Sequence, residues 1–138
     1  MKYWLIKSEP STWSWADHVR AGTTEWDGVR NHQAKLNLQA MARGDEALFY
    51  HSGKEKRIMG FVNVVRTYYP DPTDPTGRFG MVDFKAAGPM NAPVTLAQIK
   101  ADKRLANLAL VRNTRLSVQP VDAASWKIIC SKGNQPCP

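Results

Sequence analysis

The chain contains 138 residues, which is the length of one domain that can bury a sizeable core and is too short for a multidomain enzyme. Its 19 Lys and Arg side chains outnumber its 12 Asp and Glu side chains, so the formal net charge is +7 at pH 7. This excess favours a polyanionic partner, nucleic acid first, although a merely soluble basic protein has the same balance.

The first third of the chain has patterns typical of two short strands and two helices, over residues 3–7, 11–20, 24–27 and 31–43. Ser11 is the expected N-cap of the first helix. That start places Trp13 on the buried face of the helix, together with Ala16 and Val19. Trp15 then points away from this face, where it is available to a ligand or to a second copy of the chain.

Strands dominate the rest of the chain. They are predicted over residues 47–51, 57–69, 79–86 and 115–121, with a short helix over residues 96–103. Gly60, inside the long second of these strands, indicates a bulge or a close backbone approach. The Pro-rich residues 70–77 predict an irregular surface connection. Asp122 or Ser125 is expected to cap a closing turn around Trp126.

These elements predict an α+β domain, a mixed β-barrel of five or six strands with flanking short helices. Trp4 and Trp126 are expected in its core. The short apolar run at the N-terminus indicates a strand rather than a signal peptide, and no run approaches the length of a transmembrane helix. Cys130 and Cys137 are too few for a disulfide framework and lack zinc-ligand spacing. We therefore expect a cytoplasmic protein, or a nuclear one in a eukaryote.

The segment Trp26–Asn31 carries the clearest functional pattern in the chain. A tryptophan at a strand end precedes a turn glycine, and Arg30 and Asn31 follow at the start of the second predicted helix, which Gly44 ends. A flat aromatic face beside Arg and Asn suits a polar, planar ligand such as a nucleobase. The alternative is a core Trp, a structural turn and an Asn31 that only caps the helix.

Four sequence blocks in this order resemble the EVE domain family, across residues 2–130. The blocks are Tyr3–Pro10, Trp26–Asn31, Gly44–Asp45 with Phe49–Ser52, and Leu110–Arg112 with Arg115–Pro120. The resemblance implies a PUA-like pseudo-barrel with a ligand pocket and a role in reading modified bases of DNA or RNA, with modified cytosine linked to some members. It also implies one EVE domain over residues 1–132. The Gly, Asn, Gln and Pro composition of residues 133–138 predicts a flexible tail.

The chain is also similar to the YTH readers of methylated adenine, which belong to the same PUA-like superfamily. Ile6-Lys7-Ser8 matches their strand ending in Ile-Lys-Ser, and Trp26 matches a wall of their aromatic cage. The resemblance implies a second aromatic wall. Phe84 or Phe79 is the candidate for that position.

Together, the pattern and the resemblance predict a base pocket and a phosphate-binding rim. The predicted base pocket consists of Trp26, Ser8, Asn31, His51, Ser52 and Phe84. The predicted rim consists of Lys7, Arg30, Lys54, Arg112 and Arg115. For the two serines and the histidine, a purely structural role is an equal alternative, and Arg30 has the alternative of pairing with Asp27.

Catalysis is the weaker alternative. The chain contains no HxxH or CxxC motif, no G-x-S-x-G elbow and no phosphate-binding glycine loop. We expect no catalytic residue, metal or cofactor, and a monomer or weak dimer whose partner is DNA or RNA rather than a membrane. A similarity to ASCH domains, also PUA-like, leaves a hydrolase as the runner-up, with Lys7, Arg30 and His51 as its acid–base groups.

Overall fold

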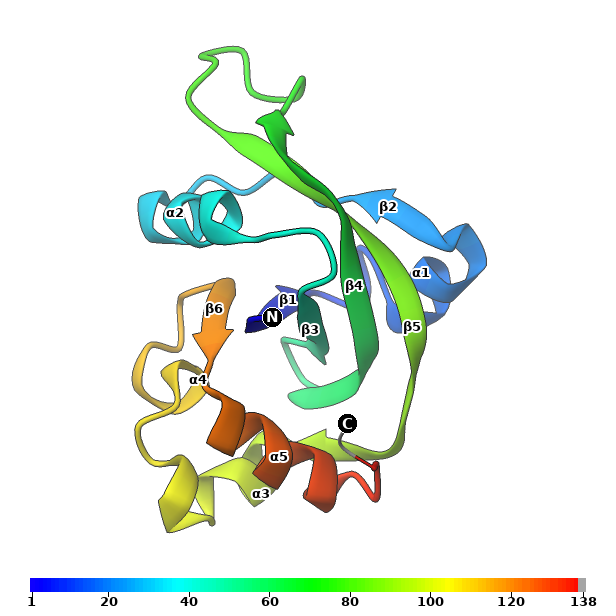
Figure 1. The fold of residues 1–138 in the computed structure, drawn as a ribbon, viewed down its shortest axis with the longest axis vertical. Coiled ribbons are helices and arrows are strands. Elements are labelled where there is room, and N and C mark those ends of the chain that lie inside the picture. Colours follow the sequence, from blue (N-terminus) through cyan, green and yellow to red (C-terminus); the bar gives the residue numbers. More distant parts are fainter. Residues whose placement is uncertain (137–138) are drawn as a thin grey trace.

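The computed structural model describes residues 1–136 of the chain, and the predicted α+β class is confirmed (Figure 1). The strands are β1 (Tyr3–Ser8), β2 (Thr23–Glu25), β3 (Glu46–His51), β4 (Arg57–Pro70), β5 (Gly80–Thr95) and β6 (Val118–Val121). The helices are α1 (Trp15–Ala21), α2 (His32–Ala40), α3 (Leu96–Lys100), α4 (Ala109–Arg112) and α5 (Ala123–Lys132), with a 3-10 turn over Lys103–Leu105.

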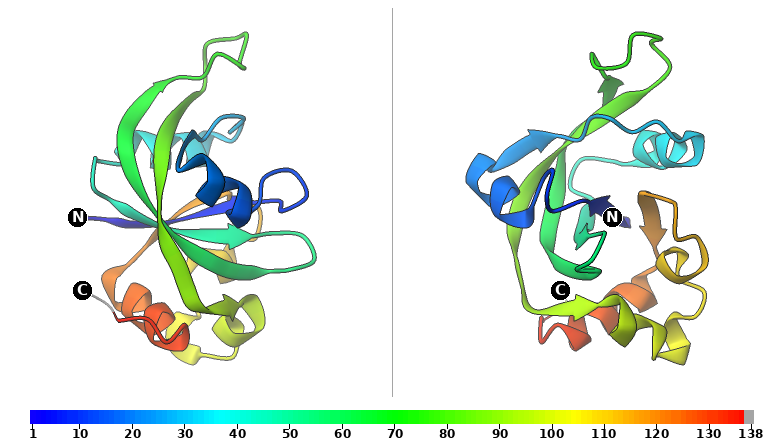
Figure 2. Two further views of the ribbon diagram at one scale, coloured as in Figure 1. Left: turned by 90° about the vertical axis from the view of Figure 1, so that its right-hand side faces the viewer. Right: turned by 180° about the vertical axis from the view of Figure 1, so that it is seen from behind.

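The strands form one mixed sheet in the order β2-β5-β4-β3-β1-β6. β1 pairs in parallel with β3 and antiparallel with β6, and the remaining neighbours are antiparallel. Register shifts along the β4–β5 pair bend this long hairpin, because a bulge adds twist and curvature. β5 therefore continues to Thr95, well beyond its predicted end at residue 86. The tip of the hairpin projects beyond the rest of the fold in each view (Figure 2).

Both faces of the sheet are buried, because successive strand side chains point to opposite faces. One face carries Ile6 and Phe49 and packs with residues of α1 and α2. The opposite face carries Leu5 and Leu48 and packs with residues of α3, α4 and α5, the three helices at the lower end of the molecule in Figure 1. The continuous apolar runs in the strands are explained by this double coverage.

Helix α1 begins one turn later than predicted, and this exchanges the roles of two tryptophans. Ser14 caps it through a capping box with Asp17, whereas the Ser11 hydroxyl donates to Glu9. The prediction that Trp15 points away from the core was wrong, since this side chain is 8% exposed. Val19, expected on the buried face, is 52% exposed, and Ala16, expected on the same face, is exposed too.

Trp15 packs against the one glycine for which the sequence predicted a close approach. A Cβ atom at Gly60 would lie 2.4 Å from Cζ2 of the Trp15 ring. The same ring meets Phe49 edge-on, with centroids 5.3 Å apart. The register also shifts next to Gly60, so both predicted features, a bulge and a close approach, are confirmed.

The connection from α2 to β3 ties the N-terminus to the sheet. α2 ends at Ala40, earlier than predicted, and the carboxylate of buried Asp45 then accepts hydrogen bonds from the backbone N–H groups of Lys2 and Ala42. The same carboxylate accepts from the indole of Trp4 at 3.0 Å. Burial opposes ionisation of this group, but these hydrogen bonds hold the pKa of Asp45 below its usual value.

At the C-terminal end, the predicted closing turn is a ten-residue helix, α5. Asp122 caps it by accepting from the N–H of Ser125 at 3.1 Å, as predicted for one of the two candidates. Trp126 is buried and stacks on Tyr3 with ring centroids 4.4 Å apart. Residues 133–135 of the predicted tail are hydrogen-bonded to Cys130 and to the β5 residues 91 and 92, while residues 137 and 138 lie outside the described part of the chain.

Candidate functional site

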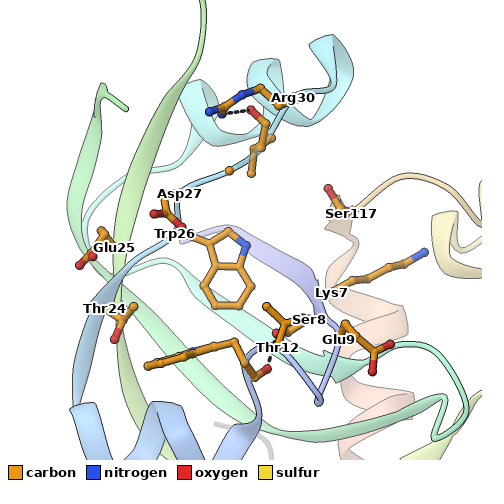
Figure 3. Close-up of a pocket in the computed structure, with 13 residues that line it drawn as sticks. Lys7, Ser8, Glu9, Thr12, Thr24, Glu25, Trp26, Asp27, Arg30 and Ser117 are labelled. Atoms are coloured by element: carbon orange, nitrogen blue, oxygen red, sulfur yellow. Dashed lines mark hydrogen bonds between the residues drawn. The ribbon is translucent and has the colours of Figure 1, made fainter. Parts of the chain in front are cut away.

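A pocket of about 630 Å³ opens on the α1–α2 side of the sheet. Pockets that bind small ligands typically have volumes of ~300–1,000 Å³, so this one can hold a nucleoside. Three segments supply its walls: the end of β1 with the loop after it, β2 with the connection to α2, and the residue just before β6. The lining residues are Lys7, Ser8, Glu9, Thr12, Trp13, Thr24, Glu25, Trp26, Asp27, Gly28, Val29, Arg30 and Ser117 (Figure 3).

Trp26 forms the central aromatic surface of the pocket, as predicted. Its backbone N–H donates to the carbonyl of Val82 at 2.8 Å, which fixes the strand end beside β5. Its half-buried ring meets Phe49 and Phe84 edge-on, with centroid distances of 5.6 and 5.7 Å. Gly28 turns the chain just after it with φ of 78°, a left-handed conformation that favours glycine.

Trp13 is the second tryptophan of the pocket, although the sequence predicted it in the core. It is half-buried, and its backbone carbonyl accepts a hydrogen bond from the hydroxyl of Ser8. Its indole N–H donates to Nδ1 of His18 at 3.1 Å. The later start of α1 explains the error, because Trp13 precedes the N-cap and lies in the loop rather than on the helix.

His18 contacts both tryptophans of the pocket. The side chain is fully buried, and its Nε2 lies 2.9 Å from the carbonyl oxygen of Phe84. Since Nδ1 accepts from an indole, which can only donate, Nε2 carries the proton and donates to that carbonyl. The His18 ring also lies 6.0 Å from the Trp26 ring, and burial lowers the pKa of this imidazole. A neutral His18 therefore holds one pocket wall and supports the other.

Of the other residues predicted for the base pocket, only Ser8 lines it. Phe84 is fully buried behind Trp26 and lies outside the lining, so Trp13 rather than Phe84 faces the pocket as the second aromatic residue. Asn31 caps α2 by accepting from the N–H of Ala34 at 2.9 Å and does not line the pocket either.

His51 and Ser52, at the end of β3, hold neighbouring segments together. Nε2 of buried His51 accepts from the N–H of Trp15 at 2.9 Å, so its Nδ1 carries the proton and faces Glu55. The Ser52 N–H donates to the carbonyl of Ser8 at 2.9 Å. Neither residue lines the pocket. The His51 ring is held between the backbone of Trp15 and the carboxylate of Glu55 instead.

The predicted phosphate-binding rim is brought together only in part. Lys7 and Arg30 line the pocket, and the Lys7 ammonium donates to the carbonyl of Thr114 at 2.8 Å while burial lowers its pKa. The other three predicted rim residues are exposed and lie outside the lining: Lys54, Arg112 and Arg115. The Arg112 guanidinium donates to the side chain of Asn107 at 2.8 Å.

Three carboxylates line the pocket beside the two cations, a feature that the sequence reasoning missed. Glu9, Glu25 and Asp27 belong to the lining, and Figure 3 shows Asp27 above the Trp26 ring. A carboxylate accepts hydrogen bonds, so it favours the amino edge of a base and disfavours a phosphate. The mixed charge makes this pocket better suited to a base than to a backbone phosphate.

The hairpin loop between β4 and β5 braces the pocket wall, although it was predicted as a mere surface connection. The buried Asp71 carboxylate accepts from the N–H of Gly28 at 2.8 Å and from the Arg30 guanidinium at 3.1 Å. Arg30 therefore pairs with Asp71 and not with Asp27. Burial opposes ionisation, but hydrogen bonds from Thr73, Gly28 and Arg30 lower the pKa of Asp71 to about 2.

A sequence signal for this braced loop exists. Residues 71–76 read Asp-Pro-Thr-Asp-Pro-Thr, a tandem repeat. Each aspartate accepts from the backbone and the hydroxyl of the threonine two residues later, a local turn that Asp favours. Such a repeat predicts an ordered loop rather than a loose connection.

The acid–base groups proposed for a hydrolase are not gathered in one place. Lys7 and Arg30 line the pocket, whereas His51 is held between Trp15 and Glu55. Within residues 1–136, no three side chains of His, Cys, Asp or Glu are grouped to hold a metal ion. Over the same residues, no helix combines the length and the apolar character needed to cross a membrane.

The chain is similar to several known proteins in sequence and in fold. The sequence profile of the EVE domain matches residues 2–132. Human thymocyte nuclear protein 1 is 34% identical over an alignment 164 residues long, which covers 94% of this chain and 72% of the human protein. A Rhodopseudomonas palustris protein has a TM-score of 0.92 and 53% identity, over 97% of this chain and 94% of its own.

Two further solved structures bear on the two functional alternatives. Human thymocyte nuclear protein 1 in complex with DNA containing 5-methylcytosine has a TM-score of 0.91 and 32% identity, over 99% of this chain and 100% of its own. The ZmASCH protein of Zymomonas mobilis has a TM-score of 0.58 and 13% identity, over 95% of this chain and 98% of its own. That second likeness concerns the fold alone.

Proposed function

The chain belongs to the EVE domain family, and from this premise we propose that it binds nucleic acid without altering it and holds one modified base in the pocket beside Trp26. A human relative has been captured with DNA containing 5-methylcytosine, which makes a modified cytosine the first ligand to test. Residues 1–132 form the binding domain in this proposal.

The observation that carries the proposal is the pair of half-buried tryptophans that line one pocket. Trp26 and Trp13 come from different segments, and both contact His18. Stacking of a base on an aromatic side chain contributes ~1–3 kcal/mol. Because His18 restrains both rings before a ligand arrives, less conformational entropy is lost when a base enters.

The polar groups of the pocket fit the edge of a cytosine. This base carries one amino donor and, on the same edge, acceptor atoms. Asp27 supplies a carboxylate acceptor, and the Ser117 hydroxyl supplies a donor on the opposite side of the Trp26 ring in Figure 3. The Lys7 ammonium donates to the carbonyl of Thr114 and points away from the ring, so it is assigned to the rim. We propose that the phosphates on either side of this base meet the predicted rim, with Lys7 and Arg30 nearest to the pocket.

The test compares oligonucleotides that differ only in one base. Binding of the purified protein to matched strands with cytosine or 5-methylcytosine is measured by fluorescence anisotropy, and the recovered strands are then weighed by mass spectrometry. The proposal expects tighter binding of the modified strand and unchanged masses at sub-stoichiometric protein. Equal affinity for the two strands would contradict the pocket assignment for this modification, and cleaved or deaminated strands would identify a hydrolase instead.

Two tryptophan variants test whether the preference for the modified base depends on the pocket at Trp26. Trp26→Ala should remove the preference for the modified base and leave weak, sequence-independent binding. Trp126→Leu is the matched control, because Trp126 lies in the core on the opposite face of the sheet and does not line the pocket. A preference that disappears equally in both variants would indicate general destabilisation rather than a site at Trp26.

A further inference from the structure

A cluster of cationic and aromatic side chains lies where the start of α2 meets the β4–β5 hairpin. We name it the Phe79 patch and define it as Arg30, His32, Lys35, Arg78 and Phe79. The Phe79 ring centroid lies 5.8 Å from the Arg30 guanidinium carbon, 5.7 Å from the Lys35 ammonium and 5.4 Å from the His32 ring centroid. Cation–π attraction to the ring face holds the two long cationic side chains close together.

Asp71 and Asp74 carry two negative charges beside the three positive charges of Arg30, Lys35 and Arg78, so the neighbouring acids offset the charge of this patch only in part. Among the ion pairs formed within residues 1–136, none involves Lys35 or Arg78, and the first turn of α2 contains no acidic residue. The nearby carboxylate of Asp74 is used inside the loop, where it accepts from the backbone N–H groups of Arg78 and Phe79 at 3.0 and 2.8 Å. Of the patch cations, only Arg30 has an acidic partner, Asp71.

The patch is continuous with the pocket. Arg30 belongs to both, since it lines the pocket and faces the Phe79 ring. Asp71 joins the two features, because its carboxylate binds the backbone of Gly28 in the pocket wall and the guanidinium of Arg30 in the patch. Figure 3 shows Arg30 beyond the upper edge of the Trp26 ring, on the side of α2.

We propose that the Phe79 patch binds backbone phosphates of the same strand whose base occupies the pocket. This inference rests on the proposed function, and it names a contact surface that shares only Arg30 with the predicted rim. The pocket itself contains three carboxylates and two cations, so it cannot supply the attraction for a polyanion. The patch supplies unpaired cations next to the pocket opening, where the phosphates beside an inserted base would pass.

The experiment measures how affinity depends on salt. Lys35→Gln/Arg78→Gln removes two patch cations and leaves Arg30 and the pocket lining intact. Lys100→Gln/Lys127→Gln removes the same charge from exposed sites on α3 and α5, at the opposite end of the molecule in Figure 1. Anisotropy titrations of one modified duplex and its unmodified match are run at several salt concentrations for the wild type and both variants.

The slope of log K against log salt is negative, and each phosphate neutralised on B-DNA contributes ~0.9 to its magnitude. Removing two phosphate-binding cations should therefore make the slope shallower by about 1.8. The patch variant should show this change, keep the wild-type ratio of affinities for modified and unmodified strands, and retain the melting temperature. The control variant should keep the wild-type slope.

Two results would overturn the proposal. In the first, the wild type and the patch variant have the same slope, which leaves the base pocket intact and moves the phosphate path elsewhere. In the second, the slope becomes as shallow in the control variant as in the patch variant, which reduces the effect to net charge. A wild type that binds the modified and unmodified duplexes equally would contradict the proposed base pocket. The slope comparison would still show whether the Phe79 patch binds phosphates.

Discussion

Trp126 of α5 and Trp26 after β2 lie on opposite sides of the sheet and have different roles. Trp126 is 2% exposed and lies against Tyr3 and Phe61, on the face that α3, α4 and α5 cover. Trp26 packs edge-on against Phe49 but keeps part of its ring in the pocket, on the face that α1 and α2 cover. Trp4 and Trp15 lie on the same face as Trp26 and are buried, so neither the residue type nor the face decides the role of a tryptophan. Trp26 follows the end of β2, where the chain leaves the sheet and part of the ring stays open to the pocket.

The largest effect is expected for Trp126→Ala. Emptying a buried aromatic site costs ~3–5 kcal/mol in the free energy of unfolding, and Trp126 does not belong to the pocket lining. Chemical denaturation should show this decrease, while the folded fraction keeps its preference for the modified base. A loss of preference at unchanged stability would contradict the division between the two faces.

Trp26→Ala should have a smaller effect on stability and a larger one on binding. Its ring is only half-buried, so we expect a cost of roughly 1–3 kcal/mol, below that of a core aromatic residue. Denaturation and anisotropy measurements on the same preparation test both parts. Trp26→Phe serves as the control, since it retains an aromatic ring and should recover part of both properties. If Trp26→Ala cost as much stability as Trp126→Ala, the comparison between the faces would fail.

Acidification should weaken the pocket face through His18. Burial lowers the pKa of this side chain in the folded state, whereas the unfolded chain takes up a proton near the ordinary value of about 6.5. The contribution of His18 to the free energy of unfolding is therefore fully present above pH 6.5, and it is lost as the pH drops from there towards the folded pKa. Protonation of the folded protein at Nδ1 also removes the acceptor for the indole of Trp13, so base binding should fall at the acidic end of this range, near the lowered folded-state pKa.

Melting temperatures from pH 8 to pH 5 test this expectation. His18→Gln is the matched variant, because an amide can accept from Trp13 and donate to the carbonyl of Phe84 without titrating. The variant should show a shallower loss of stability than the wild type. Identical pH profiles would assign the acid sensitivity to other groups.

The smallest effect on stability is expected for Arg112→Ala/Arg115→Ala. Both side chains are exposed, so the change in the free energy of unfolding should stay within ~0.5 kcal/mol. If the predicted rim binds phosphate, the magnitude of the salt slope should fall by ~0.9 for each phosphate that is no longer bound, equally for all sequences. An unchanged slope would remove these two residues from the nucleic-acid surface, and a large drop in melting temperature would show that they are structural.

The sequence predicted the strands well, because their apolar runs are long and bounded by turn residues. It failed at α1, where Ser11 and Ser14 are both suitable N-caps one turn apart. Choosing the wrong one interchanged Trp13 and Trp15, since local periodicity cannot tell which of two neighbouring tryptophans meets the sheet. Ser14, unlike Ser11, is followed three residues later by an acid, Asp17, which completes a capping box. The close approach of Trp15 to Gly60 then fits this helix start.

The site was predicted less completely than the fold. Trp26 was found because a turn glycine follows it, but the support from His18 depends on a tertiary contact with the carbonyl of Phe84. The brace formed by Asp71 likewise joins residues 43 positions apart in the chain. Contacts of this kind leave little trace in a single sequence, although the tandem repeat in the hairpin loop was visible.

The position of β1 has a consequence for synthesis on the ribosome. β1 is the first strand to leave the exit tunnel, yet it lies between β3 and β6, the last strand. One edge of β1 therefore remains unpaired until Val121 has emerged, after every other strand of the sheet. Closing contacts between segments so distant in sequence is slow, so the nascent domain exposes an apolar strand edge for most of its elongation. Chaperone binding to the nascent chain should persist until β6 is released.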